Sequence, residues 1–312
     1  MKVSALTLGN TQVENNVFLA PMAGYTDFAY RNLQLGLGVG LAFTELVSAK
    51  GLMYGGEGSK DLLFCDGKEN KTAVQLFGCD EYFMRSACES EYLRPFNIVD
   101  INMGCPVPKV FKNGEGSALL LDIKKAEKIV KECVKSGKIV TIKIRTGQRQ
   151  GDDIASEFAL MAENSGAKLI TIHGRVREMY YSGEVDFNAI EKAKKSVKIP
   201  VIANGGIFTL DDANLMIERT GADGVMLARG AIANPFLGAN IVGKTSNLTL
   251  KDYIKEHISL MLKKSPDQKV AKEFRKFTPY YFKGMVGVKD LKNGINTAES
   301  TEQIINLVDR YL

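Results

Sequence analysis

The sequence contains few cysteines, only two histidines and no long hydrophobic run. Its five cysteines are widely spaced and form no Cys-x-x-Cys pair; they are Cys65, Cys79, Cys88, Cys105 and Cys133. This spacing argues against a zinc site or a disulfide framework and is typical of a protein kept in a reducing cytoplasm. No apolar run approaches the roughly 18–20 residues of a membrane helix, and the N-terminal residues show no signal-peptide pattern. We therefore expect a cytoplasmic protein with neither a bound metal nor a membrane segment.

Charge is nearly balanced along most of the chain. The net charge is +5, and residues 245–312 hold twelve Lys/Arg against eight Asp/Glu, so most of the excess lies at the C-terminal end. Such a basic segment beside a nearly neutral body could hold a phosphate backbone, or it could be an ordinary solvated helical face. Charge alone leaves both readings open.

Apolar, strand-like runs alternate with segments whose apolar residues recur at helical spacing. The strand-like runs are residues 17–20, 41–47, 72–77, 98–102, 139–144, 168–173, 200–204 and 224–228. The intervening helical segments include residues 81–93, 124–135, 154–163 and 211–219, and residues 249–312 have helical spacing throughout. Eight strands alternating with helices close a (β/α)₈ barrel. The sequence thus predicts an α/β TIM barrel over residues 1–243, followed by a small helical domain over residues 244–312.

One stretch, residues 98–121, is the first candidate for chemistry. It begins as a buried strand, breaks at Asn102, Gly104 and Cys105, and continues as a glycine-punctuated loop. Parallel α/β proteins place their catalytic groups just past the carboxyl ends of strands. Cys105 is therefore a candidate catalytic residue.

Two glycine loops follow the seventh and eighth strand-like runs. They are Asn204-Gly205-Gly206 and Ala228-Arg229-Gly230. Loops at these two places of a barrel often bind phosphate through backbone N–H groups, and Arg229 can add charge-assisted hydrogen bonds. Together the two loops predict a phosphate site.

Other polar residues fall on or just after the predicted strands. Lys143 and Arg145 alternate on the fifth strand and share one face, where unpaired cations would be costly without a ligand or a carboxylate. His173 ends the sixth strand and is followed by Arg175, while Gln75 on the third strand offers an amide suited to the edge of a heterocycle. The second histidine, His257, falls in a helical segment and is expected to be structural.

These residues belong to motifs that resemble the tRNA-dihydrouridine synthase family. The motifs are APMAGYTD at 20–27, QLFG at 75–78, DINMGCP at 100–106, KNGEGSALL at 112–120, KIRTG at 143–147, TIHGR at 171–175, ANGGI at 203–207 and MLARGA at 226–231. In the C-terminal segment, FRKFTPYYFKG at 274–284 resembles the helical RNA-binding region of that family.

The resemblance implies an FMN enzyme that reduces uridine in tRNA to 5,6-dihydrouridine with NADPH as reductant. We expect the protein to be a monomer. By similarity, FMN would be bound by Pro21, Met22, Ala23, Gln75, Lys143, His173, Asn204, Gly205, Gly206, Ala228 and Arg229. Cys105 would protonate C5 of the uracil while N5 of reduced FMN delivers hydride to C6, and a thiol with a pKa near ~8.5 is mostly protonated at neutral pH. Asn102, Arg145 and Arg175 would contact the uracil or its phosphate, and Lys272, Arg275, Lys276 and Lys283 would bind RNA phosphates.

The chain departs from the family pattern at three positions. Gly206 and Ala228 stand where the family commonly has aspartate and glycine, and Phe277 stands where a histidine is common. Three alternatives remain open at this point. They are a dihydrouridine synthase of ribosomal RNA, an FMN barrel reductase of a free pyrimidine or a dihydroorotate-like molecule, and a flavin-bearing protein that helps RNA fold.

Overall fold

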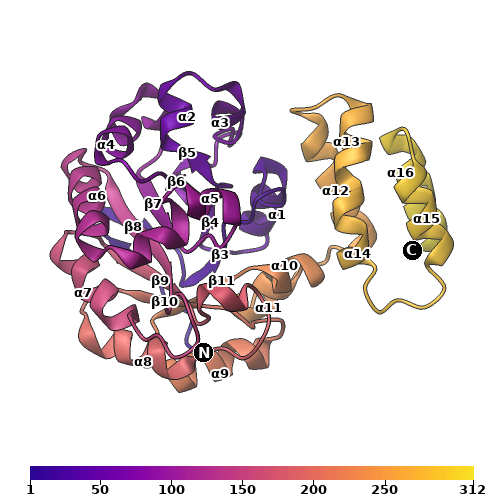
Figure 1. The fold of residues 1–312 in the computed structure, drawn as a ribbon. Coiled ribbons are helices and arrows are strands. Elements are labelled where there is room, and N and C mark those ends of the chain that lie inside the picture. Colours follow the sequence, from indigo (N-terminus) through magenta and orange to yellow (C-terminus); the bar gives the residue numbers. More distant parts are fainter.

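The computed structural model describes all of residues 1–312. Eight parallel strands form the barrel: β3 (Val17–Leu19), β4 (Leu41–Phe43), β6 (Thr72–Phe77), β7 (Ile98–Met103), β8 (Ile139–Arg145), β9 (Leu169–His173), β10 (Val201–Asn204) and β11 (Gly224–Leu227). Pairing between β4 and β6 closes the sheet, and the short β5 (Val47–Ser48) adds to the end of β6. The predicted TIM barrel is confirmed, and each of the eight predicted runs contains a barrel strand, although residues 41–47 form one only over Leu41–Phe43 (Figure 1).

The barrel interior changes from apolar to polar along the strand direction. Side chains such as Ile98, Ile139 and Ile202 pack inside its amino end. Two residues of an N-terminal hairpin, Leu8 of β1 (Leu6–Leu8) and Val13 of β2 (Thr11–Val13), join this cluster. The sequence analysis did not anticipate this hairpin. Because this apolar cluster fills the amino end of the barrel, the polar side chains gather at the carboxyl ends of the strands.

Helices surround the barrel in the expected alternation. They are α1 (Phe28–Gly36), α2 (Ala49–Met53), α3 (Glu57–Asp61), α4 (Glu81–Glu89), α5 (Pro108–Lys112), α6 (Ile123–Lys135), α7 (Ala155–Asn164), α8 (Phe187–Ser196), α9 (Leu210–Thr220), α10 (Arg229–Ala233) and α11 (Leu237–Val242). The predicted helical segment 81–93 consists of α4 and a separate 3₁₀ turn at Glu91–Leu93. Short helices α2, α5 and α10 directly follow strands and therefore lie at the catalytic end of a barrel.

The C-terminal region is helical, as predicted. It contains α12 (Leu250–Leu262), α13 (Asp267–Phe274), α14 (Thr278–Tyr281), α15 (Lys289–Thr297) and α16 (Thr301–Tyr311). The helical spacing runs through residues 268–281 without interruption, but a 3₁₀ turn at Arg275–Phe277 separates α13 from α14. Pro279 in the first turn of α14 explains the break, because proline lacks the N–H that a continuous helix would need.

The C-terminal helices pack against the barrel beside α1 and α10 (Figure 1). Tyr30 of α1 stacks on Phe277, with ring centroids 5.8 Å apart. Gln34, also on α1, donates to the carbonyl of Pro235 at 3.0 Å and to the hydroxyl of Tyr253 at 3.2 Å. Barrel and C-terminal helices thus share one continuous hydrophobic core. None of the helices combines the length and apolar composition needed to cross a membrane.

Candidate active site

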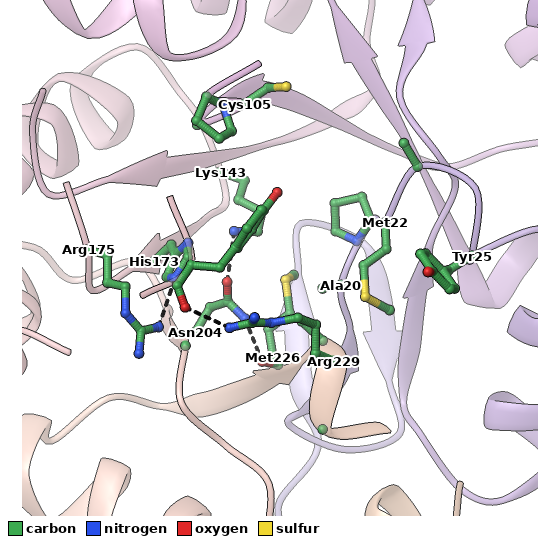
Figure 2. Close-up of a pocket in the computed structure, with 18 of the residues that line it drawn as sticks. Ala20, Met22, Tyr25, Cys105, Lys143, His173, Arg175, Asn204, Met226 and Arg229 are labelled. Atoms are coloured by element: carbon green, nitrogen blue, oxygen red, sulfur yellow. Dashed lines mark hydrogen bonds between the residues drawn. The ribbon is translucent and has the colours of Figure 1, made fainter. Parts of the chain in front are cut away.

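A cavity of about 560 Å³ opens at the carboxyl ends of the barrel strands. Its lining contains every residue that the sequence analysis assigned to FMN, to proton donation or to uracil contact, with the exception of Gln75. Figure 2 shows His173 and Arg175 on one side of the cavity, and Met22 and Tyr25 on the other. Residues from seven of the eight barrel strands or their following loops therefore meet in one site, as the strand-end pattern predicted.

Cys105 is held in a fixed position at the edge of this cavity. Its backbone N–H donates to Oδ1 of Asn102 at 2.9 Å, and its carbonyl accepts from the hydroxyl of Ser117 at 2.8 Å. The side chain is partly buried, and burial raises the pKa of the thiol, although the Val107 N–H and the Arg145 charge act in the opposite direction. The thiol is therefore protonated at neutral pH and available as a proton donor.

Gln75 lies beneath the cavity and outside its lining. Its side chain is fully buried, donates to Asp100 at 2.6 Å and accepts from Asn102 at 2.7 Å. Thr141 donates to the other oxygen of Asp100 at 2.6 Å. Burial raises the pKa of Asp100 to about 6 despite these bonds and the Lys143 charge. The network fixes Asn102, which in turn fixes Cys105.

Lys143 projects into the cavity from β8. Its ammonium donates to Oδ1 of Asn204 at 3.0 Å, and the Asn204 amide donates to the carbonyl of Met226 at 2.8 Å. Burial, together with the nearby Arg145, lowers the pKa of Lys143 to about 7. A neighbouring anion would restore its charge. This makes Lys143 a natural partner for an anionic ligand.

His173 is neutral and its tautomer is determined by a neighbour. Nη1 of Arg175 lies 3.3 Å from Nε2 of His173, and because a guanidinium can only donate, Nε2 must accept and Nδ1 must carry the proton. Burial and four surrounding cations hold the pKa of His173 well below its usual value. Arg175 also donates to the carbonyl of Gly183, at 2.8 Å from Nη2 and 3.1 Å from Nε.

Two arginines hold the loop after β9 against the cavity. Arg145 donates to the carbonyls of Gly104 and Tyr180 at 2.8 and 2.7 Å, and Arg229 donates to that of Tyr181 at 2.9 Å. The guanidinium carbons lie 5.5 Å and 5.1 Å from the centroid of the Tyr181 ring. Arg145 and Arg229 thus place Tyr181 on the lining in addition to contributing charge.

The opposite wall comes from both parts of the chain. Tyr25, in the loop after β3, lies beside Tyr280 of α14, and burial, together with the interaction with that hydroxyl, raises the pKa of Tyr25 to about 12. Their rings meet edge to face with centroids 5.7 Å apart. Sequence analysis assigned no role to Tyr25, Tyr181 or Tyr280, although Tyr25 and Tyr280 lie within the motifs that it quoted. Only the folded chain shows that a residue of the C-terminal helices completes the cavity.

The four residues predicted to bind RNA phosphates have different environments. Lys272 and Lys283 are exposed and form no ion pair within the protein. Arg275 donates to the carbonyl of Ala298 at 2.8 Å, and Lys276 lies 3.8 Å from a carboxylate oxygen of Asp27 in the barrel. Arg275 and Lys276 therefore connect parts of the protein, while Lys272 and Lys283 are free for a partner.

Phe277 and His257 both belong to the core between barrel and C-terminal helices. Both side chains are fully buried, with ring centroids 4.6 Å apart. The hydroxyl of Tyr281 hydrogen-bonds Nδ1 of His257 at 2.9 Å, and burial lowers the pKa of His257 to about 4. His257 is structural, as expected. The departure at Phe277 falls in this core and away from any surface that RNA could touch.

The cavity suits an anionic ligand with an extended apolar part. Lys143, Arg145, Arg175 and Arg229 all line it, and none of them forms an ion pair with a carboxylate of the protein. The N–H groups of Gly205 and Gly206 donate to no backbone carbonyl. Its volume lies within the ~300–1,000 Å³ typical of cofactor and small-molecule sites.

Comparison with solved structures supports the fold. The chain aligns with a 2-naphthoyl-CoA reductase at a TM-score of 0.60 and 13% identity, over 77% of this chain and 52% of that one. It aligns with the 6-hydroxypseudooxynicotine amine oxidase of Pseudomonas geniculata at a TM-score of 0.58 and 14% identity, over 77% and 48% of the two chains. At these identities the similarity shows a shared barrel architecture.

Sequence comparison identifies the family. The dihydrouridine synthase model matches residues 18–311. The tRNA-dihydrouridine synthase B of Pasteurella multocida is 33% identical over 97% of this chain and 94% of its own length. The tRNA-dihydrouridine synthase B of Vibrio cholerae is 31% identical over 98% of each chain. With the family model spanning barrel and C-terminal helices alike, the chain belongs to the dihydrouridine synthase family.

Proposed function

We propose that this protein reduces uridines in tRNA to 5,6-dihydrouridine, with FMN bound in the cavity and NADPH as the source of electrons. Membership of the family supports the reaction, the flavin and the RNA substrate. FMN as the particular flavin and NADPH as the reductant are further parts of the proposal. The observation that carries it is the position of Cys105, a protonated thiol fixed at the edge of a cavity with four unpaired cations.

The lining residues fit a flavin with a phosphate tail. The N–H groups of Gly205 and Gly206, together with Arg229, would hold the phosphate, since anions bind where backbone donors and a guanidinium converge. Pro21, Met22 and Ala23 would support the ring system from the side of β3. The aspartate common in the family at position 206 is not needed for this role, because glycine supplies the same backbone donor.

Lys143 and His173 would adjust to the charge of the bound group. Lys143 is only partly protonated in the free protein, since burial lowers its pKa to about 7. An anionic ring edge nearby would raise that pKa and fix the positive charge there. His173, held neutral with its proton on Nδ1, would present a hydrogen-bond donor instead of a further cation.

The protein's own part in the reaction is proton transfer to the substrate. Bound in reduced form, the flavin would supply a hydride for C6 of the uracil, and C5 would then need a proton. Cys105 would donate the proton from its thiol to C5, and the thiolate would regain one from solvent before the next turnover. Gln75 and Asn102 act indirectly in this scheme, by holding the backbone of Cys105 in place.

Asn102, which lines the cavity although it is mostly buried, and the Arg145 and Arg175 guanidiniums would contact the uridine or its phosphate. The C-terminal helices would bind the rest of the RNA. Extruding a uridine from folded RNA costs a few kcal/mol, and contacts of lysines with phosphates can offset that cost. Lys272 and Lys283 are placed to make such contacts, while Arg275 and Lys276 would keep the helices in position.

Nucleoside analysis by mass spectrometry tests the proposal. RNA from cells lacking the gene would be compared with RNA from cells that carry the wild type, Cys105→Ala or the near-isosteric Cys105→Ser. We expect loss of dihydrouridine from tRNA in the deletion strain, full recovery with the wild type, no recovery with alanine and at most weak recovery with serine. Unchanged tRNA in the deletion strain would contradict the proposal, and loss confined to ribosomal RNA would contradict the choice of tRNA.

A further inference from the structure

A group of aromatic side chains on the barrel rim is exposed to solvent instead of packing in the core. Tyr54, after α2, and Tyr82, in α4, are 72% and 71% exposed. Phe83 lies between them, with ring centroids 5.6 Å from Tyr54 and 5.5 Å from Tyr82. The ammonium of Lys50 lies 5.6 Å from the centroid of Phe83. We refer to Lys50, Tyr54, Tyr82 and Phe83 as the rim aromatic cluster. Exposed apolar surface of this kind commonly marks an interaction site.

The rim aromatic cluster is connected to the edge of the active-site cavity. Val107, just after Cys105, lines the cavity and is 46% exposed, and α5 begins at the next residue. At the far end of α5 the thiol of Cys79 donates to the carbonyl of Asn113 at 3.3 Å, which ties α5 to the loop that leads into α4. The loop from Asn113 to Gly116 thus runs from Cys79, before α4, to Cys105 at the cavity edge. Figure 1 shows α2 and α4 farther from α12 to α16 than α1 and α10 are.

Charge on this part of the rim favours a polyanion. Lys50 and Lys112 are exposed and form no ion pair with a carboxylate, whereas nearby Glu57 and Glu81 are paired with lysines of their own. Glu115, an acidic residue near enough to interact with the Lys50 charge, is partly buried, and burial raises its pKa. Lys50 and Lys112 are thus free to contact phosphates, while the carboxylate of Asp80 caps α4 by accepting from the N–H groups of Tyr82 and Phe83.

We propose that the rim aromatic cluster binds single-stranded RNA beside the uridine that enters the cavity, with bases stacked on Tyr54 and Tyr82. This inference rests on the proposed function. When a uridine is extruded, its neighbours lose a stacking partner. Exposed aromatic faces provide a replacement that accepts any base, and Lys50 and Lys112 would neutralise the adjoining phosphates. The RNA would then be held on both sides of the mouth, by this cluster and by the C-terminal helices.

Equilibrium binding of a fluorescein-labelled tRNA transcript to the full-length protein tests this inference. Tyr54→Ala and Tyr82→Ala should each weaken binding about fivefold or more, because stacking of one base contributes ~1–3 kcal/mol. Tyr54→Phe and Tyr82→Phe keep the ring and should bind within about twofold of the wild type. Leu215→Ala is the matched control, since Leu215 is 44% exposed on α9, outside the rim, and should bind like the wild type.

Two further measurements separate the outcomes. Flavin absorbance per protein and NADPH oxidation without RNA should be the same in every tyrosine variant, since none of these residues lines the cavity. Wild-type affinity in the Tyr54→Ala/Tyr82→Ala double variant would overturn the inference while leaving the proposed function intact. If the wild type itself neither bound nor reduced tRNA, the proposed function would fail and the inference with it. A loss of affinity that the phenylalanine variants share would also overturn the inference, because it would show that stacking is not the source.

Discussion

Replacement of Gly205 by alanine should damage the cofactor site more than the small size of the added methyl group suggests. Gly205 follows β10 with a φ of +115°, a conformation that residues with a side chain rarely adopt. A Cβ at this position would lie 2.8 Å from Cδ2 and 3.1 Å from Nε2 of His173, and 3.3 Å from Nη1 of Arg175. The added methyl group would therefore press on the hydrogen bond that fixes the histidine.

The free-energy cost of Gly205→Ala has two contributions. A backbone forced into such a conformation costs ~1–3 kcal/mol, and overpacking against a buried ring costs ~1–3 kcal/mol. The sum, ~2–6 kcal/mol, is a large part of the ~5–15 kcal/mol by which a typical domain is stable. If the ring moves instead, His173 loses its bond to Arg175 and flavin binding weakens. Gly205→Ala should therefore lose stability, flavin or both.

Gly221→Ala provides the matched control. Gly221 ends α9 with a φ of +63°, and no heavy atom lies within 4 Å of a Cβ built there. Its substitution should cost only the ~1–2 kcal/mol of the left-handed conformation. Urea unfolding of the flavin-free proteins and the flavin-to-protein absorbance ratio measure the two effects. Equal stability of both variants, with full flavin in Gly205→Ala, would refute the reasoning.

Four further predictions concern charge and the C-terminal helices. Lys143→Met should stabilise the flavin-free protein by more than ~1 kcal/mol at pH 7 and abolish flavin retention. Because the pKa of Lys143 falls from 10.5 to about 7 on folding, this gain in stability, measured by urea unfolding, should shrink as the pH rises from 7 to 10.5. Folding lowers the pKa of His257 from 6.5 to about 4, so the unfolded chain is protonated first as the pH falls. The free energy of unfolding of the wild type should therefore drop by up to ~3 kcal/mol between pH 6.5 and pH 4. His257→Phe should lose less stability over this range, and equal losses in both proteins would contradict this. Lys272→Gln with Lys283→Gln should weaken tRNA binding and reduce its log–log salt slope by about 1.4–1.8, with unchanged melting temperature and flavin content. Tyr280→Ala should raise KM for tRNA at unchanged flavin content, and an unaltered KM would show that the cavity does not need the C-terminal helices.

The barrel could be predicted from the sequence because its strands are buried on both faces. Runs such as residues 139–144 and 168–173 are almost continuously apolar, and their carboxyl ends carry the glycines and polar residues of the site. In a closed parallel barrel all carboxyl ends meet at one rim. Assigning residues to strand ends was thus enough to predict that one site contains Cys105, Lys143, His173 and Asn204.

The sequence could not show which polar residues reach the cavity and which support it from below. Gln75 and Asn102 lie on adjacent strands in similar motifs, yet Gln75 is fully buried while Asn102 touches the cavity. Their difference depends on depth along the barrel axis, which a single sequence does not encode. The same limit applies to Arg275, whose guanidinium bonds the backbone of Ala298 twenty-three residues away. A count of basic residues cannot separate such an internal role from an exposed one.

The cations of the site are held by backbone carbonyls where carboxylates might have been expected. Arg145, Arg175 and Arg229 each donate to carbonyls of the loop after β9. A carboxylate partner would have neutralised these charges, whereas a carbonyl fixes the guanidinium and leaves its net charge available. The one buried carboxylate nearby, Asp100, lies below the cavity, hydrogen-bonded to Gln75 and Thr141. The fold thus keeps a positive potential directed at the cavity, and binding of an anionic group there should offset the burial and the charge repulsion that together lower the pKa values of Lys143 and His173.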